Sequence, residues 1–167
     1  MPTKAAIIAA LALVVAPAAA VRAEPARAPA WKLVDVDGRE VSSAQFKGKV
    51  LVLDFWATWC GPCRSEIPAY VSLQKKYGQE GLAIVGVSLD EEGPGRAGLV
   101  RKFMRKFEMN YTVVFAGDDT AAAFGGIDAI PTTFLIDRDG NIRDKKVGAE
   151  ASGEYEKKVL AVLKPAP

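Results

Sequence analysis

The chain has 167 residues, half of them hydrophobic and a quarter charged, with a net charge of +2. This length fits one domain, and the balance of apolar and charged residues is typical of a packed globular core rather than a disordered chain. The small net charge gives no reason to expect a nucleic-acid partner. Histidine is absent, which excludes histidine acid–base catalysis, cysteine–histidine proteolysis and any metal site that needs histidine.

Residues 1–23 have the pattern of an export signal. They carry a positive charge at Lys4, an apolar run and then a helix-breaking Pro17. Val21 and Ala23 have the spacing that a signal peptidase reads, so we expect cleavage after Ala23. The alternative is an uncleaved membrane anchor, although the apolar run is shorter than the roughly 20 residues that a span needs. In both cases the rest of the chain is expected in an extracytoplasmic compartment such as the periplasm.

The remainder of the chain predicts a linker over residues 24–30 and one domain over residues 31–167. Apolar periodicity and turn residues predict strands at 31–36, from 40 onward, at 50–55, 82–89, 111–115, 132–136 and 141–147. They predict helices from residue 60 to Gly78, at 99–107, at 120–124 and at 152–163. Strands that alternate with helices and close with a hairpin indicate an α/β fold around a mixed sheet. The basic residues of 99–107 are interpreted as a solvated helix face.

Cys60 and Cys63 are the only cysteines, and they are three residues apart. A disulfide stabilises a fold mainly by closing a long loop, so a bond between these two would add little stability. Two thiolates without histidine leave a tetrahedral zinc site half empty, so we expect no metal and no cofactor. This spacing instead favours thiol–disulfide exchange, which needs an attacking thiolate and a second thiol nearby.

The predicted helix start assigns a role to each thiol. Unpaired backbone N–H groups and the helix dipole favour negative charge at a helix N-terminus. Cys60 is therefore expected to be the exposed, more acidic, attacking thiol, and Cys63, one turn further on, the more buried resolving thiol. Pro62 fits the first helical turn, where its missing N–H leaves no bond unmade.

The segment from Asp54 to Cys63, D-F-W-A-T-W-C-G-P-C, resembles the active-site segment of thioredoxin. The chain from about residue 30 onward is similar to the exported TlpA/ResA branch of that superfamily, most clearly over residues 48–68, 83–90 and 130–140. The resemblance implies an exported thiol–disulfide oxidoreductase. It also implies a thioredoxin-like three-layer fold with a central mixed sheet, an N-terminal β-hairpin and an extra inserted helix.

The resemblance further implies which residues meet the substrate. Ile130-Pro131 matches the cis-proline loop, which in the superfamily packs beside the cysteine pair and holds substrate as an added strand. Trp59 matches an exposed aromatic residue beside the attacking cysteine. Gly61 and Pro62, between the two cysteines, are expected to contact the substrate with it.

Asp54 and Glu66 are the candidate acids of the site. An ionised carboxyl group is costly to bury in an apolar strand, so the pKa of Asp54 is expected to be raised. In thioredoxin the matching acid exchanges a proton with the resolving thiol, and we hypothesise the same for Asp54. Thioredoxin pairs that acid with a lysine from the next strand, however, and residues 82–89 contain none. Asp54 at a water pocket or sheet edge is the alternative. Glu66 is a candidate for tuning the site, and a solvated helical carboxylate is its simpler interpretation.

Gly61-Pro62 also bears on the direction of the reaction. It is the pair found in thioredoxin, a reductant at about −270 mV, whereas the oxidant DsbA lies at about −120 mV. The sequence therefore predicts a reductant. The resemblance implies that a membrane electron donor re-reduces it, and we expect a monomer. The expected partners are disulfide-containing exported client proteins, with apocytochrome c or metal-site assembly proteins as family-level candidates. Thr132 stands where the cytochrome-maturation subgroup has glutamate, which weakens the match to that subgroup.

Two other classes of protein remain as alternatives. A peroxidase on a similar fold would place its attacking cysteine in a Thr/Ser-rich loop with a distant resolving partner, and this chain shows neither feature. A non-catalytic binding module would not need Cys60 and Cys63. Turnover of hydrogen peroxide distinguishes the first alternative, and insulin reduction distinguishes the second.

Overall fold

The computed structural model describes residues 26–164, so the export signal predicted over residues 1–23 lies outside the described residues. The strands are β1 (Lys32–Asp35), β2 (Glu40–Ser42), β3 (Val50–Trp56), β4 (Leu82–Ser88), β5 (Thr112–Phe115), β6 (Thr132–Ile136) and β7 (Ile142–Val147). The helices are α1 (Gly61–Tyr77), α2 (Arg96–Lys106), α3 (Asp118–Ala123) and α4 (Ser152–Leu163), with short 3₁₀ turns η1 (Ser43–Phe46) and η2 (Gly78–Glu80). Within 26–164, no helix is long and apolar enough to cross a membrane.

All seven strands form one sheet in the order β2-β1-β5-β4-β3-β6-β7. Strands β3, β4 and β5 run parallel, whereas β6 and β7 are antiparallel to their neighbours. The N-terminal hairpin of β1 and β2 joins the sheet because β1 pairs with β5. The predicted mixed α/β sheet with an N-terminal hairpin is therefore confirmed.

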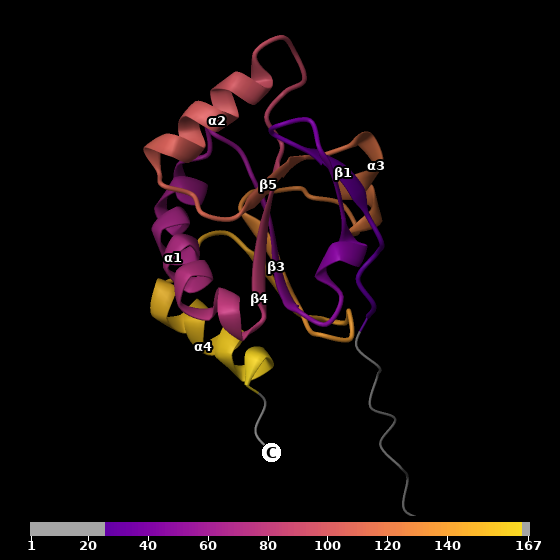
Figure 1. The fold of residues 1–167 in the computed structure, drawn as a ribbon, viewed down its shortest axis with the longest axis vertical. Helices are drawn as coiled ribbons and strands as arrows, with labels where there is room; N and C mark the ends of the chain where they lie inside the picture. Colours follow the sequence, from indigo (N-terminus) through magenta and orange to yellow (C-terminus); the bar gives the residue numbers. More distant parts are fainter. Residues whose placement is uncertain (1–25, 165–167) are drawn as a thin grey trace, which may run out of the picture.

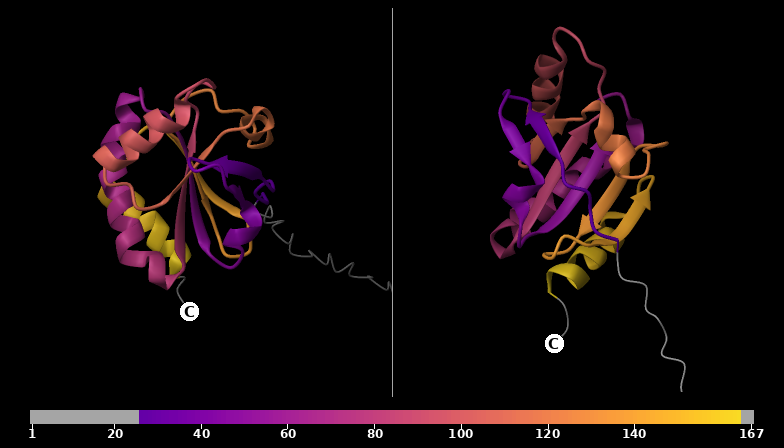
Figure 2. Two further views of the ribbon diagram at one scale, coloured as in Figure 1. Left: turned by 45° about the horizontal axis from the view of Figure 1, so that its top comes forward. Right: turned by 90° about the vertical axis from the view of Figure 1, so that its right-hand side faces the viewer.

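The helices divide between the two faces of the sheet. Helices α1, α2 and α4 lie together on one face, and α3 lies on the opposite side with the N-terminal hairpin (Figures 1 and 2). All seven residues of β3 are buried, because this central strand is covered on both faces. Its side chains alternate between two apolar clusters, with Val52 on the α1 side and Leu53 on the other. This gives the three-layer fold that the resemblance implies.

The structure confirms the bounds of one predicted helix and corrects the start of another. Helix α4 begins and ends at the predicted residues and buries Tyr155, Val159 and Leu163. The predicted start of the basic helix at residue 99 is wrong, because α2 begins at Arg96. Gly95 has a φ of +98°, and Arg96 donates its N–H to the carbonyl of Gly93 at 3.2 Å. This tight turn ends the preceding loop three residues before the apolar pattern begins.

Candidate active site

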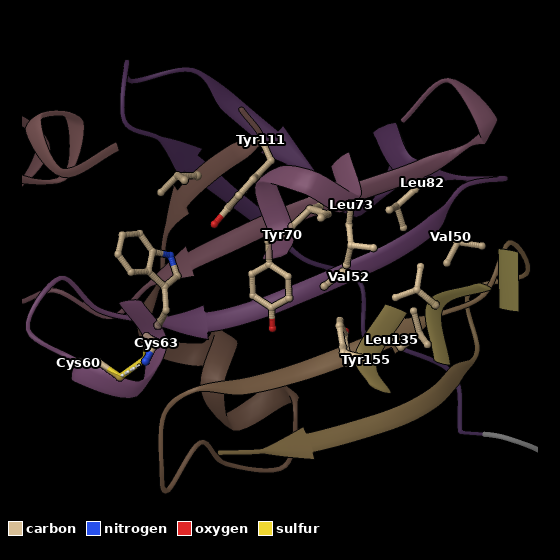
Figure 3. Close-up of a cluster of buried hydrophobic side chains, with 14 of the residues drawn as sticks. Val50, Val52, Cys60, Cys63, Tyr70, Leu73, Leu82, Tyr111, Leu135 and Tyr155 are labelled. Carbon is tan, nitrogen blue, oxygen red and sulfur yellow. Dashed lines mark hydrogen bonds between the residues drawn. A yellow bond between two sulfur atoms is a disulfide. The ribbon is translucent and has the colours of Figure 1, made fainter. Parts of the chain in front are cut away.

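Cys60 and Cys63 form a disulfide at the N-terminus of α1. Figure 3 shows the two sulfur atoms at one end of the buried cluster on the α1 side, with Val50 and Leu82 at the other end. Cys60 is the N-cap residue, and its Sγ accepts a hydrogen bond from the backbone N–H of Cys63 at 3.2 Å. Because this N–H and the helix dipole favour negative charge, the same position stabilises a thiolate on Cys60 when the disulfide is reduced.

The expectation that Cys60 is exposed is wrong for this oxidised form. Only 5% of Cys60 and 2% of Cys63 are exposed, so Cys63 is the more buried of the two, as predicted. The loop that carries Ile130 covers the sulfur of Cys60, since the carbonyl oxygen of Ile130 lies 3.7 Å from Sγ. Trp59, the residue before Cys60, is by contrast 66% exposed.

The loop before β6 is held beside the disulfide by the sheet. The Ile130–Pro131 peptide bond is cis, which is the geometry that the resemblance implies. The carbonyl of Pro131 accepts a hydrogen bond from the N–H of Gly148 at 2.8 Å, and the following strand β6 pairs with β3. Gly61 and Pro62, between the two cysteines, are exposed. That these residues contact a substrate stays a prediction.

Asp54 lies in the middle of the central strand and not at a sheet edge, so the edge alternative is wrong. It is 4% exposed, and its Oδ1 accepts a hydrogen bond from the hydroxyl of Thr133 at 2.8 Å. Burial raises the pKa of Asp54 to about 7, while the Thr133 hydrogen bond and the charge of Lys146 act in the opposite direction. Since the single hydroxyl proton of Thr133 goes to ionised Asp54, the Tyr70 hydroxyl, 3.1 Å away, must donate to Thr133.

Thioredoxin has a lysine in the strand next to its buried acid, and the structure shows why β4 has none. Gly86 of β4 lies directly opposite Asp54 of β3. A Cβ atom at Gly86 would lie 2.7 Å from Nε1 of the buried Trp56 indole. The indole therefore occupies the space beside Asp54 into which a side chain of β4 would extend.

The interpretation of Glu66 as a solvated carboxylate is wrong. Glu66 is 6% exposed, forms an ion pair with Lys146 of β7 and accepts the backbone N–H of Glu150 at 3.0 Å. It is buried because it shares the sheet-facing side of α1 with Cys63 and Tyr70, three residues before it and four residues after it. Sequence reasoning missed Lys146, whose only local signal is its inward position in the alternating pattern of β7.

Asp90 is a second residue that sequence reasoning missed. It follows β4, and its carboxylate accepts the backbone N–H of Thr58 at 3.1 and 3.2 Å and the Thr58 hydroxyl at 2.5 Å. The hydroxyl of Ser88 donates to the same carboxylate at 2.9 Å. Because Thr58 lies two residues before Cys60, Asp90 holds the turn that places the disulfide. An acid at the carboxyl end of a strand parallel to β3 was the available signal.

We expect Asp90→Asn to loosen this turn. An amide presents one acceptor oxygen where the carboxylate presents two, so one buried donor loses its partner at a cost of about 1–3 kcal/mol. Urea unfolding of the oxidised protein should show that loss, and the rate of disulfide exchange should fall. The matched control is Asp37→Asn in the exposed β1–β2 turn, which should change neither quantity. Unaltered exchange with Asp90→Asn would contradict the positioning role.

Proteins of known function that resemble this chain are thiol–disulfide oxidoreductases or thioredoxin-like proteins. The pattern that defines the Redoxin family matches residues 23–163. The chain belongs to the Redoxin family. The chain is 30% identical to thiol-disulfide oxidoreductase ResA of Bacillus cereus, covering 77% of this chain and 72% of that protein. It is 34% identical to the thioredoxin-like protein YneN of Bacillus subtilis, covering 81% and 78%.

Solved structures of similar proteins have the same fold. A thioredoxin-family thiol:disulfide interchange protein from Chlorobium tepidum superposes with a TM-score of 0.77 at 37% identity, covering 86% of this chain and 99% of that one. A putative thiol:disulfide interchange protein DsbE from the same organism superposes with a TM-score of 0.74 at 34% identity, covering 83% and 96%. The predicted thioredoxin-like, ResA-like fold is confirmed. This Redoxin family member is a thiol–disulfide oxidoreductase that acts on disulfide-containing substrates, and its Cys60 and Cys63 form a disulfide.

Proposed function

We propose that this protein reduces disulfides in exported client proteins, with Cys60 as the attacking thiol and Cys63 as the resolving thiol. One observation carries the assignment of roles. The sulfur of Cys60 caps α1 and accepts the N–H of Cys63, so the helix terminus stabilises the thiolate on Cys60. Cys63 lies inside the first turn and is the more buried of the two, which suits a thiol that attacks only within the protein.

The proposed reaction begins with the reduced dithiol. The Cys60 thiolate attacks one sulfur of the client disulfide, so the client S–S bond breaks, a mixed disulfide forms and the released client thiolate takes a proton. Cys63 then loses its proton to Asp54 and attacks Sγ of Cys60. The second client sulfur leaves as a thiolate and is protonated, and the protein is left with the Cys60–Cys63 disulfide. Two electrons have passed from the protein to the client.

Asp54 suits the proposed role of proton acceptor for Cys63. A general base transfers protons most effectively when its pKa lies near the working pH, and burial raises the pKa of Asp54 to about 7. Asp54 and Thr133 lie on the α1 side of the sheet, because Asp54 bonds to Thr133 and Thr133 bonds to Tyr70 of α1. Cys63 lies on the sheet-facing side of the same helix.

The client would bind at the surface beside the disulfide. Trp59, Gly61 and Pro62, the neighbours of Cys60 in the chain, are exposed there, and the Ile130 carbonyl lies 3.7 Å from the Cys60 sulfur. An extended client segment beside that loop would bring its disulfide to Cys60. Apocytochrome c and metal-site assembly proteins are the client classes we propose.

The proposed direction and compartment rest on two sequence features. Gly61-Pro62 is the pair found in a reductant, and residues 1–23 have the pattern of an export signal. In an oxidising compartment the protein would need re-reduction, for which we propose a membrane electron donor. The chain would act as a monomer, either released after cleavage near Ala23 or tethered through residues 1–23.

Two measurements test this function. Equilibration with glutathione buffers should give a reduction potential near that of thioredoxin, about −270 mV. A value near that of DsbA, about −120 mV, would overturn the reductive direction. Exported Cys63→Ser protein should accumulate mixed disulfides on Cys60, and mass spectrometry would identify the clients. Trapping of cytosolic proteins alone would contradict the extracytoplasmic role.

A further inference from the structure

Asp54, Thr133 and Lys146 form a row across three neighbouring strands. Asp54 of β3 is directly opposite Thr133 of β6, and Thr133 is directly opposite Lys146 of β7. Directly opposed residues point to the same face of a sheet. The two outer backbones of the row are about 10 Å apart, because neighbouring strands are spaced by about 4.8 Å. A lysine side chain is long enough to cross much of that distance.

Helix α1 places Glu66 over this row. Lys146 donates to Glu66 Oε1 and to the carbonyl of Gly148 at 3.2 Å. Glu66 lies one helical turn from Cys63, a rise of about 4.5 Å along the helix axis. The ammonium group of Lys146 also lies over the rings of Tyr70 and Tyr155, 6.0 and 5.3 Å from their centroids. Asp54, Glu66 and Lys146 thus share one buried space between α1 and the sheet, one helical turn along α1 from Cys63.

The other titratable groups that face this space are tyrosines. Burial raises the pKa of Tyr70 and Tyr155, and also of Tyr111, well above the ordinary value, and the charge of Asp54 acts in the same direction. These three hydroxyls are therefore neutral over the working range of the protein. Asp144 and Glu150 lie at the rim, where both pair with Lys158 of α4.

The buried space holds more carboxylates than ammonium groups, and this imbalance decides which carboxyl group exchanges a proton. Two carboxylates share the space with one ammonium group, and burial of the excess negative charge is unfavourable. Glu66 has both Lys146 and the N–H of Glu150 as partners. Asp54 has only the hydroxyl of Thr133. Of the two carboxyl groups, Asp54 is therefore the one that takes up and releases a proton.

We propose that Lys146 and Glu66 form a charge pair that sets the pH at which Asp54 takes up and releases its proton. Lys146 is in this sense a positioning residue, whose charge holds Asp54 ionised at a lower pH than burial alone would allow. Glu66 partly cancels that charge and so keeps Asp54 able to accept a proton near neutral pH. The pair transfers no proton itself. The consequence for catalysis rests on the proposed function, in which Asp54 accepts the proton of Cys63.

Three variants test the pair: Lys146→Met, Glu66→Gln, and the two together. The ¹³C chemical shift of the Asp54 carboxyl carbon, followed against pH in the oxidised protein, reports its protonation directly. Lys146→Met removes a positive charge and should raise the midpoint by about one pH unit or more. Glu66→Gln removes a negative charge and should lower it by a similar amount. The double variant should lie between the single ones, near the wild type.

The directions in which the two single variants move the Asp54 midpoint decide the outcome. Opposite displacements in the single variants support the proposal, and the pH profile of mixed-disulfide resolution by Cys63 should follow them. Midpoints that stay in place, or that move in one direction for both, overturn it. Lys146→Met leaves Glu66 buried without its partner, so if that variant does not fold, Glu66→Gln and the double variant decide the question. Lys145→Met, at an exposed position of β7, is the control that should leave the midpoint unchanged.

The same samples separate this inference from the proposed function. If the wild type fails to reduce insulin or a trapped client, the proposed function fails, whatever the carboxyl titration shows. If the wild type is active but neither single variant moves the Asp54 midpoint, the charge pair alone fails.

Discussion

Asp54→Asn should make the stability of the oxidised protein less dependent on pH. Burial raises the pKa of Asp54 from 3.8 to about 7. The folded state therefore binds this proton more tightly than the unfolded state does. Below pH 3.8 both states are protonated and Asp54 costs nothing, whereas above about pH 7 the folded state carries the full cost of a buried carboxylate. At about 1.4 kcal/mol per pH unit, the difference amounts to about 4 kcal/mol.

The quantity to measure is the difference in unfolding free energy between Asp54→Asn and the wild type. Asparagine retains an acceptor for the Thr133 hydroxyl, and its amide N–H₂ adds a cost of about 1–3 kcal/mol that does not change with pH. The difference should therefore shift in favour of the variant by up to about 4 kcal/mol between pH 4 and pH 8. Urea unfolding at several pH values checks this.

Thr133→Ser is the matched control for this experiment. It keeps the hydroxyl that donates to Asp54, so it should preserve the pH dependence of the wild type. Parallel stability curves for Asp54→Asn and the wild type would contradict a raised pKa at Asp54. In the reduced protein, a pH–rate profile of disulfide reduction that Asp54→Asn leaves unaltered would rule out its role as proton acceptor.

Cys60→Ser and Cys63→Ser should abolish turnover in different ways. Cys60→Ser removes the attacking thiolate, so the rate of insulin reduction should fall on the order of a thousandfold or more. Cys63→Ser keeps the attack and removes the resolution, so one equivalent of client should be captured as a stable mixed disulfide. Insulin reduction under excess dithiothreitol and non-reducing gel electrophoresis measure the two effects. Capture by Cys60→Ser instead would reverse the two roles.

The two cysteine variants should fold like the wild type. The bond between Cys60 and Cys63 closes a loop of only three residues' separation, so its loss removes little chain entropy from the unfolded state. Urea midpoints close to that of the reduced wild type would verify that the lost activity is chemical and not structural.

Local sequence determined most of the elements and the redox pair. The apolar run of β3 and the four-residue spacing of Tyr155, Val159 and Leu163 reflect backbone periods that each segment carries in itself. The spacing of Cys60 and Cys63 at a helix start is equally local. It was sufficient to predict thiol–disulfide chemistry, because helix geometry alone brings the two thiols together.

Only the tertiary structure decided the surroundings of that pair. Glu66 bonds to Lys146 across 80 residues of sequence, Asp54 to Thr133 across 79, and Thr58 to Asp90 across 32. A charged residue in a helix or strand looks the same in the sequence whether its face meets water or another element. Burial of Glu66 and Lys146 depends on how α1 packs over β7, and coverage of Cys60 depends on the loop before β6. The sequence alone was enough to predict which atoms react, and the packing determined the charges that surround them.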